Sequence, residues 1–86
     1  TEKIKFILAS YNAGPGHVQD AARLAEKHGK DPMIWTANVD DFMLKKANPE
    51  YYNDPLVKFG YCRGSEPYNY VNDILIRYDT YRLHIQ

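Results

Sequence analysis

Apolar side chains recur at helical spacing along most of the 86-residue chain. Ile4, Ile7, Leu8 and Tyr11 fall at i, i+3, i+4 and i+7, which is the pattern of one face of a helix already under way at the first residues. No segment alternates apolar and polar residues with the period of two that a half-buried strand requires. The chain is therefore expected to be all-α.

The octet Ser10–His17, SYNAGPGH, follows this first stripe. Gly14, Pro15 and Gly16 are expected to break the helix, because glycine permits a positive φ and proline disfavours helix in the residue before it. A second helix should follow at once and end at Gly29, which suits a left-handed cap. Its apolar stripe consists of small residues, which predicts close packing against a neighbour: Val18, Ala21, Ala22 and Ala25.

A shorter third helix is predicted from Asn38 to Lys46, with Asn38 as its N-cap. Asp40 and Asp41 lie in its first turn, where we interpret them as partners of the helix dipole and not as a catalytic pair. Lysines occupy its last turn, as the same dipole favours. The predicted buried face of this helix consists of Val39, Phe42 and Met43.

Prolines and asparagines punctuate the segment Ala47–Pro55, so a surface loop with at most one helical turn is expected there. The last helix should begin near Ser65, whose hydroxyl suits an N-cap. Its apolar positions are Tyr70, Val71, Ile74 and Tyr78. The prediction is thus four helices and no sheet.

Charge and composition exclude several classes of function. Eleven basic residues balance eleven acidic ones, so the chain lacks the basic excess of a nucleic-acid-binding domain. No apolar run is long enough to span a bilayer, and the first residues match neither a signal nor a transit peptide. Cys62 is the only cysteine and is interpreted as a small, half-buried apolar side chain.

Motifs for metal, nucleotide or nucleophile chemistry are absent from the sequence, so no metal or cofactor is predicted. His17, His28 and His84 show no ligand spacing, and we interpret His17 as a polar residue early in a helix instead of a general base. The eight tyrosines are unusual for this length. Their rings and hydroxyls suit the binding of sugars, but they suit partly solvated interfaces between helices equally well.

Tyr11 and Asn12 are the most suggestive polar pair. They lie at a predicted helix end beside a glycine-rich bend, where a phenol and an amide can be held rigidly at the edge of a cleft. Asparagine offers both a donor and an acceptor, as recognition of an acetamido group requires. This pair is therefore a candidate binding site for an N-acetylated sugar.

Two segments carry a resemblance to a known family. Tyr11, Asn12, Ala13, Gly14 and Gly16 resemble the AYNxGxG signature of the goose-lysozyme-like lytic transglycosylases. The segment GYCRGSE with the following YV pair resembles the GYxRGxE…YV pattern near the C-terminus of such enzymes, and the similarity extends over nearly the whole chain. Ser10 and Cys62 depart from it, each standing where alanine is usual.

The resemblance implies a lysozyme-like fold and cleavage of the β-1,4 bond between N-acetylmuramic acid and N-acetylglucosamine, ending in a 1,6-anhydro sugar. One glutamate in a Glu-Ser motif upstream of AYN acts first as acid and then as base. None of the four glutamates here precedes a serine: Glu2, Glu26, Glu50 and Glu66. Residues 1–86 are therefore expected to be the C-terminal half of the catalytic domain, without its catalytic residue.

By the same resemblance, Tyr11 and Asn12 line the saccharide groove, and Tyr70 projects towards the catalytic glutamate and orients it. The Tyr11 or Asn12 side chain should then approach that of Tyr70 on a common concave surface. Arg63 and Glu66 are expected to form an ion pair that anchors the GYCRG loop. The implied partners are peptidoglycan strands and the upstream half of the domain. The implied location is the periplasm, with the full-length parent protein associated with the outer membrane.

Two alternatives remain open at this level. The chain could be a stand-alone helical module that binds peptidoglycan or a protein. It could also be an autonomous enzyme with Glu50 or Glu66 as the acid, which requires one of them to be buried beside Tyr11 and Tyr70.

Overall fold

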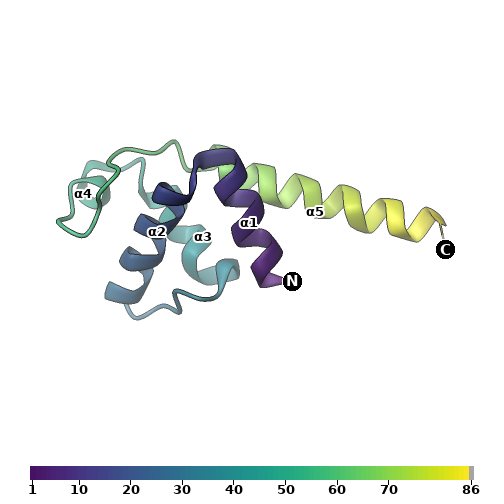
Figure 1. Cartoon of the computed structure of the whole chain (residues 1–86), viewed down its shortest axis with the longest axis horizontal. Helices are drawn as coiled ribbons and strands as arrows, with labels where there is room; N and C mark the ends of the chain where they lie inside the picture. Colours follow the sequence, from purple (N-terminus) through teal and green to yellow (C-terminus); the bar gives the residue numbers. More distant parts are fainter. Residues whose placement is uncertain (86) are drawn as a thin grey trace.

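The computed structural model describes residues 1–85, which are all-α and contain no strand (Figure 1). The helices are α1 (Glu2–Ala13), α2 (Pro15–Lys27), α3 (Asp40–Lys45), α4 (Pro49–Tyr52) and α5 (Ser65–Ile85). An irregular helical turn, η1 (Trp35–Val39), leads into α3. The predicted fold class is confirmed, and α4 is the single turn allowed for in the 47–55 loop.

The break between α1 and α2 is narrower than predicted. Gly14 alone separates the two helices, with φ of 98°. Pro15 is the first residue of α2, a position where its fixed φ suits a helix and its missing N–H would be unpaired in any case. Gly16 is already helical, so most of the SYNAGPGH octet belongs to helices.

The core lies where α1, α2, α3 and the start of α5 meet. α1 packs against both α5 and α2, and α2 packs against α3. The small-residue stripe of α2 is buried as predicted, with only Ala22 partly exposed. The buried apolar residues are Ala9, Val18, Ala21, Leu24, Ala25, Trp35, Val39, Phe42, Met43, Cys62 and Val71.

Most of the predicted stripe of α1 lies outside its buried face. Ile4, Ile7 and Tyr11 are 48%, 58% and 83% exposed, and only Leu8 of the stripe packs against the core, together with Phe6 and the fully buried Ala9. α1 therefore has two apolar faces, one turned to this core and one open. The helical period alone could not show which of them the fold would use.

The start of α3 also differs from the prediction. Asn38 does not cap the helix, since its side-chain oxygen accepts from the backbone N–H of Asp31 at 2.9 Å and its amide donates to the Thr36 carbonyl. The chain turns at Ala37, with φ of 61°, before entering α3. Asn38 thus closes the preceding loop, while Val39, Phe42 and Met43 are buried as predicted.

α5 begins at Ser65 as expected, but Ser65 is its first helical residue, so Gly64 and not Ser65 holds the N-cap position. Gly64 is required there, because a Cβ atom would overlap the Met43 carbonyl group of α3. The outer part of α5 projects beyond the other helices and gives the chain its longest dimension, 48 Å (Figure 1). No helix within residues 1–85 has both the length and the apolar composition to cross a membrane.

Candidate functional site

Two tyrosines from the first and last helices meet on one side of the α1–α5 pair. The rings of Tyr11 on α1 and Tyr70 on α5 stack with centroids 6.4 Å apart and planes 18° apart. The predicted approach of the two side chains is confirmed, but neither ring lines the neighbouring hollow, so the concave surface is not shared by all three residues. Tyr70 is half-buried beneath its partner, so Tyr11 presents a supported and largely exposed aromatic face.

Asn12 follows Tyr11 and lies on the edge of a neighbouring hollow. This hollow has a volume of about 190 Å³ and lies between the end of α1, the start of α2 and the GYCRG loop. Its lining combines polar and apolar side chains and comprises Asn12, Ala13, His17, Tyr61, Cys62, Arg63, Glu66 and Pro67. The two halves of the sequence resemblance therefore meet at one surface feature.

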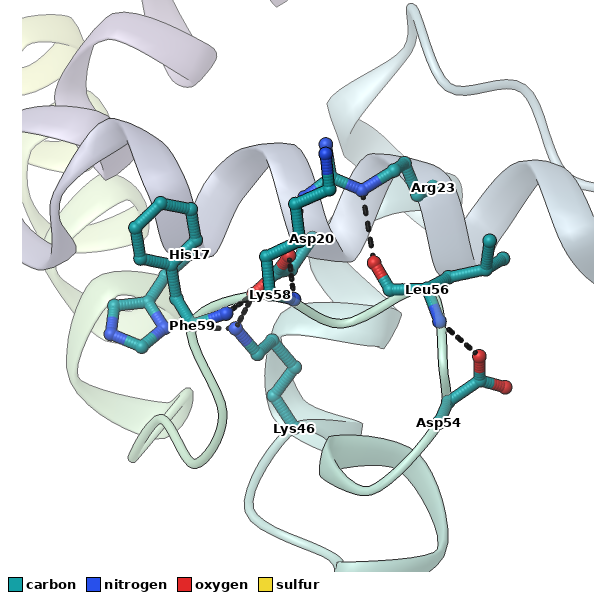
Figure 2. A network of polar contacts seen from close by, with 8 residues as sticks. All are labelled: His17, Asp20, Arg23, Lys46, Asp54, Leu56, Lys58 and Phe59. Atoms are coloured by element: carbon teal, nitrogen blue, oxygen red, sulfur yellow. Dashed lines mark hydrogen bonds and ion pairs between the residues drawn. The ribbon is translucent and has the colours of Figure 1, made fainter.

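An ion pair with no exposed surface lies directly behind this hollow. Asp20 on α2 and Lys46 at the end of α3 are both 0% exposed, and Lys46 Nζ donates to Asp20 Oδ2 at 2.7 Å. Asp20 also accepts from the backbone N–H groups of Lys58 and Phe59 and from Arg23 (Figure 2). One carboxylate thereby fixes the 58–59 loop to α2.

These contacts determine the charge of Asp20. Its burial alone would raise the pKa, but the hydrogen bonds from Lys46 and the loop N–H groups outweigh burial and lower the pKa from 3.8 to about 2. Asp20 is therefore ionised at neutral pH. The pair has no net charge, and every buried polar side-chain atom of the described residues has a hydrogen-bond partner.

His17 connects this pair to the hollow. Its Nδ1 lies 2.8 Å from Lys46 Nζ, and its ring meets that of Phe59 edge to face at 6.2 Å. Burial and the Lys46 charge lower the pKa of His17, although the Asp20 charge partly opposes them. The imidazole is thus favoured in its neutral form.

None of the glutamates offers a proton-donating site. Glu2 accepts hydrogen bonds from Lys5 and Thr36, which lower its pKa from 4.5 to about 2. Glu26, Glu50 and Glu66 are exposed. The autonomous-enzyme alternative required a buried Glu50 or Glu66 and is therefore wrong on this point.

Asp40 is the carboxyl group with a raised pKa, because it is partly buried on α3. It lies in the first turn beside Asp41, as the dipole interpretation placed it. Within residues 1–85, no three His, Cys, Asp or Glu side chains are grouped so as to hold a metal ion.

The Arg63–Glu66 pair is present but does not anchor its loop. The charged atoms are 3.9 Å apart, and the side chains are 74% and 66% exposed, so the pair adds little stability. The loop is held instead by the backbone, where Cys62 N–H donates to the Lys46 carbonyl, and by Gly64 against α3. Cys62 itself is buried and apolar in role, as interpreted from the sequence, and burial raises its pKa.

Sequence reasoning missed the Asp20–Lys46 pair and its contact with His17. Lys46 was expected only to complement the helix dipole. Asp20 offered a signal, because it lies among the small buried residues of α2 and has Arg23 three positions later. A carboxylate on a buried face requires a partner, but the helical pattern does not identify it.

Comparison with known proteins gives a consistent result. The chain is 50% identical over 75 residues to the membrane-bound lytic murein transglycosylase F of Marinobacter nauticus, covering 87% of this chain and 14% of that protein. It is 44% identical over 79 residues to the protein of that name from Shewanella frigidimarina, covering 92% of this chain and 16% of that protein. For the Vibrio parahaemolyticus protein, the identity is 43% over 84 residues, or 98% and 15% of the two chains.

No family model matches the chain. The chain spans only 14–16% of the length of these three relatives. The resemblance predicted from the SYNAGPGH and GYCRGSE segments is nevertheless confirmed, since over most of its length this chain is similar to proteins named membrane-bound lytic murein transglycosylase F.

Proposed function

We propose that this chain forms part of the saccharide groove of a peptidoglycan lytic transglycosylase and receives its proton-transferring glutamate from another segment of the same protein. The observation that carries the proposal is the stacked pair of Tyr11 and Tyr70 beside Asn12. The similarity to lytic murein transglycosylases supplies the substrate class.

The geometry suits a sugar ligand. Tyr11 is 83% exposed, and its ring lies nearly parallel to that of Tyr70, which supports it from behind. A fixed aromatic face with a polar edge matches the apolar face and hydroxyl rim of a sugar ring. The adjacent Asn12 amide adds a donor and an acceptor for an acetamido group.

The open face of α1 suits a covering segment. A hollow of about 640 Å³ lies between α1 and α5, and its apolar lining includes Ile4, Leu8, Ile74, Leu75 and Tyr78. We propose that the upstream half of the catalytic domain packs here and places its glutamate near Tyr70. The relatives are long enough to provide such a segment. We also propose that this chain lies in the periplasm and that the full-length protein containing it is associated with the outer membrane.

Binding to purified sacculi tests the groove. Removing the exposed ring in Tyr11→Ala should weaken co-sedimentation of the 86-residue chain roughly 3- to 10-fold, since an aromatic contact contributes about 0.5–1.5 kcal/mol beyond its area. Tyr81→Ala is the matched control, because Tyr81 is 66% exposed on the outer part of α5. That variant should bind as the unmodified chain does.

Equal loss in both variants would show non-specific adhesion of exposed tyrosines and contradict the proposed groove. Circular dichroism of each variant establishes that its helical content is unchanged.

A further inference from the structure

We infer that His17 is locked as the Nε2–H tautomer and donates this hydrogen bond, beside Asn12, to an amide carbonyl oxygen of a ligand in the hollow. The identity of that ligand as peptidoglycan rests on the proposed function. The tautomer and the hollow rest only on the contacts around His17.

The tautomer follows from the partner of Nδ1. Lys46 pairs with the ionised Asp20 and is itself an ammonium, which has three donors and no acceptor. At 2.8 Å from Lys46 Nζ, Nδ1 must therefore accept, and the ring proton must reside on Nε2. A second proton on the ring would place two positive charges in contact.

The position of the ring is equally constrained. Lys46 and Asp20 are fully buried, and the Phe59 ring packs against the imidazole from another side. Figure 2 shows one imidazole nitrogen turned to Lys46 and the other directed away from the network. Such a ring is a preorganised donor, because its orientation is fixed before any ligand arrives.

The free nitrogen is open to solvent. His17 is one of the residues that line the hollow, and Nε2 has no hydrogen-bond partner within residues 1–85. Since every buried polar side-chain atom in that range is paired, Nε2 must be accessible to solvent. A neutral N–H donor beside the Asn12 amide selects a ligand that presents a carbonyl oxygen next to an N–H.

Two parts of peptidoglycan offer an amide of this kind, namely the acetamido group of a sugar and the peptide stem. The tests are titrations of the 86-residue chain with an N-acetylglucosamine tetramer and, separately, with a stem tetrapeptide. Long-range ¹H–¹⁵N NMR spectra of the free chain should show the Nε2–H tautomer, and the Nε2 resonance should shift with one of the two ligands.

His17→Leu removes the donor at similar size, whereas His17→Gln retains an amide donor. We expect the affinity for the bound ligand to fall about 3- to 10-fold in His17→Leu, as for loss of one hydrogen bond, and to be largely retained in His17→Gln. His84→Leu is the matched control, because His84 is exposed on the outer part of α5 and does not line the hollow, and it should leave the affinity unchanged.

A free chain with the Nδ1–H tautomer would overturn the inference whatever the ligand. Unchanged affinity in His17→Leu would also overturn it. The same holds if the chain binds neither ligand although its attachment to sacculi depends on Tyr11. The proposed function would survive each of these results. Absence of sacculus binding altogether would overturn both.

Discussion

Asp20 is the residue on which the local structure of the site depends most. Its one carboxylate joins α2, the end of α3 and the 58–59 loop, and through Lys46 it determines the state of His17. The loop in turn places Phe59 against Gly16, where a Cβ would collide with the ring. A buried charge thus sets the geometry of the hollow without lining it.

This arrangement predicts a loss of stability in acid. The Asp20 pKa is lowered to about 2 in the folded chain, so its contribution is complete above its ordinary value of 3.8 and is lost as the pH falls towards 2. The free energy of unfolding, from urea titrations at pH 5 and pH 2, should decrease by about 2 kcal/mol through this group.

Other carboxylates also titrate in that range, so the comparison is with the double variant Asp20→Asn/Lys46→Met, which lacks the ion pair. The decrease in the double variant should be smaller by that amount. If the free energy of unfolding depends equally on pH in the two proteins, Asp20 does not contribute to the loss of stability in acid.

Elements were predictable from the sequence where one residue type decides the local structure. Gly29 follows α2 with φ of 81°, a conformation that glycine adopts readily because it has no Cβ. The small apolar residues of α2 pack closely, as predicted. The faces of α1 were not predictable, because Ile4 and Phe6 are both apolar and only tertiary packing selects between them. The predicted N-cap at Asn38 is wrong, because the Asn38 amide is hydrogen-bonded to the preceding loop instead.

The candidate site divides in the same way. Tyr11, Asn12 and Tyr70 were identified through the family resemblance, and the stacking of the two tyrosines agrees with it. The contact between His17 and Lys46 joins residues 29 positions apart. No local pattern encodes such a contact, because it depends on how α2 and α3 pack.

The junction of the GYCRG loop with α5 predicts a specific packing defect. In Gly64→Ala the new methyl group would overlap the Met43 carbonyl group, which belongs to the backbone and cannot move alone. We expect a loss of more than about 3 kcal/mol in the free energy of unfolding, measured in urea. The control is Gly29→Ala, which has open space and a positive φ and should cost only about 1 kcal/mol. Similar losses in both variants would contradict this packing.

The outer part of α5 predicts a local difference in stability. Every residue from Ile76 to His84 is exposed, whereas Val71 is fully buried. A helix without tertiary contacts is marginal in water, so amides in 77–84 should exchange at least roughly 10-fold faster than that of Val71. Hydrogen-exchange NMR measures this directly, and uniform protection along α5 would contradict the prediction.

At the scale of the whole molecule, the chain combines a packed core with an open apolar face and an exposed aromatic pair. Ile4, Ile7 and Tyr78 are each about half exposed or more on that side. The glutamates of this chain are exposed or held ionised, which supports the proposal that an upstream segment covering this face supplies the carboxylic acid. In that proposal Tyr70 positions the acid.

The most direct test is release of 1,6-anhydro muropeptides from sacculi, detected by mass spectrometry. The 86-residue chain alone should release none, whereas a chimera in which it replaces the matching segment of the Marinobacter nauticus relative should release them. In the chimera, Tyr70→Phe should lower kcat more than it raises KM, because the hydroxyl orients the acid and does not hold the sugar. Release by the isolated chain, or an inactive chimera that is folded, would contradict the account.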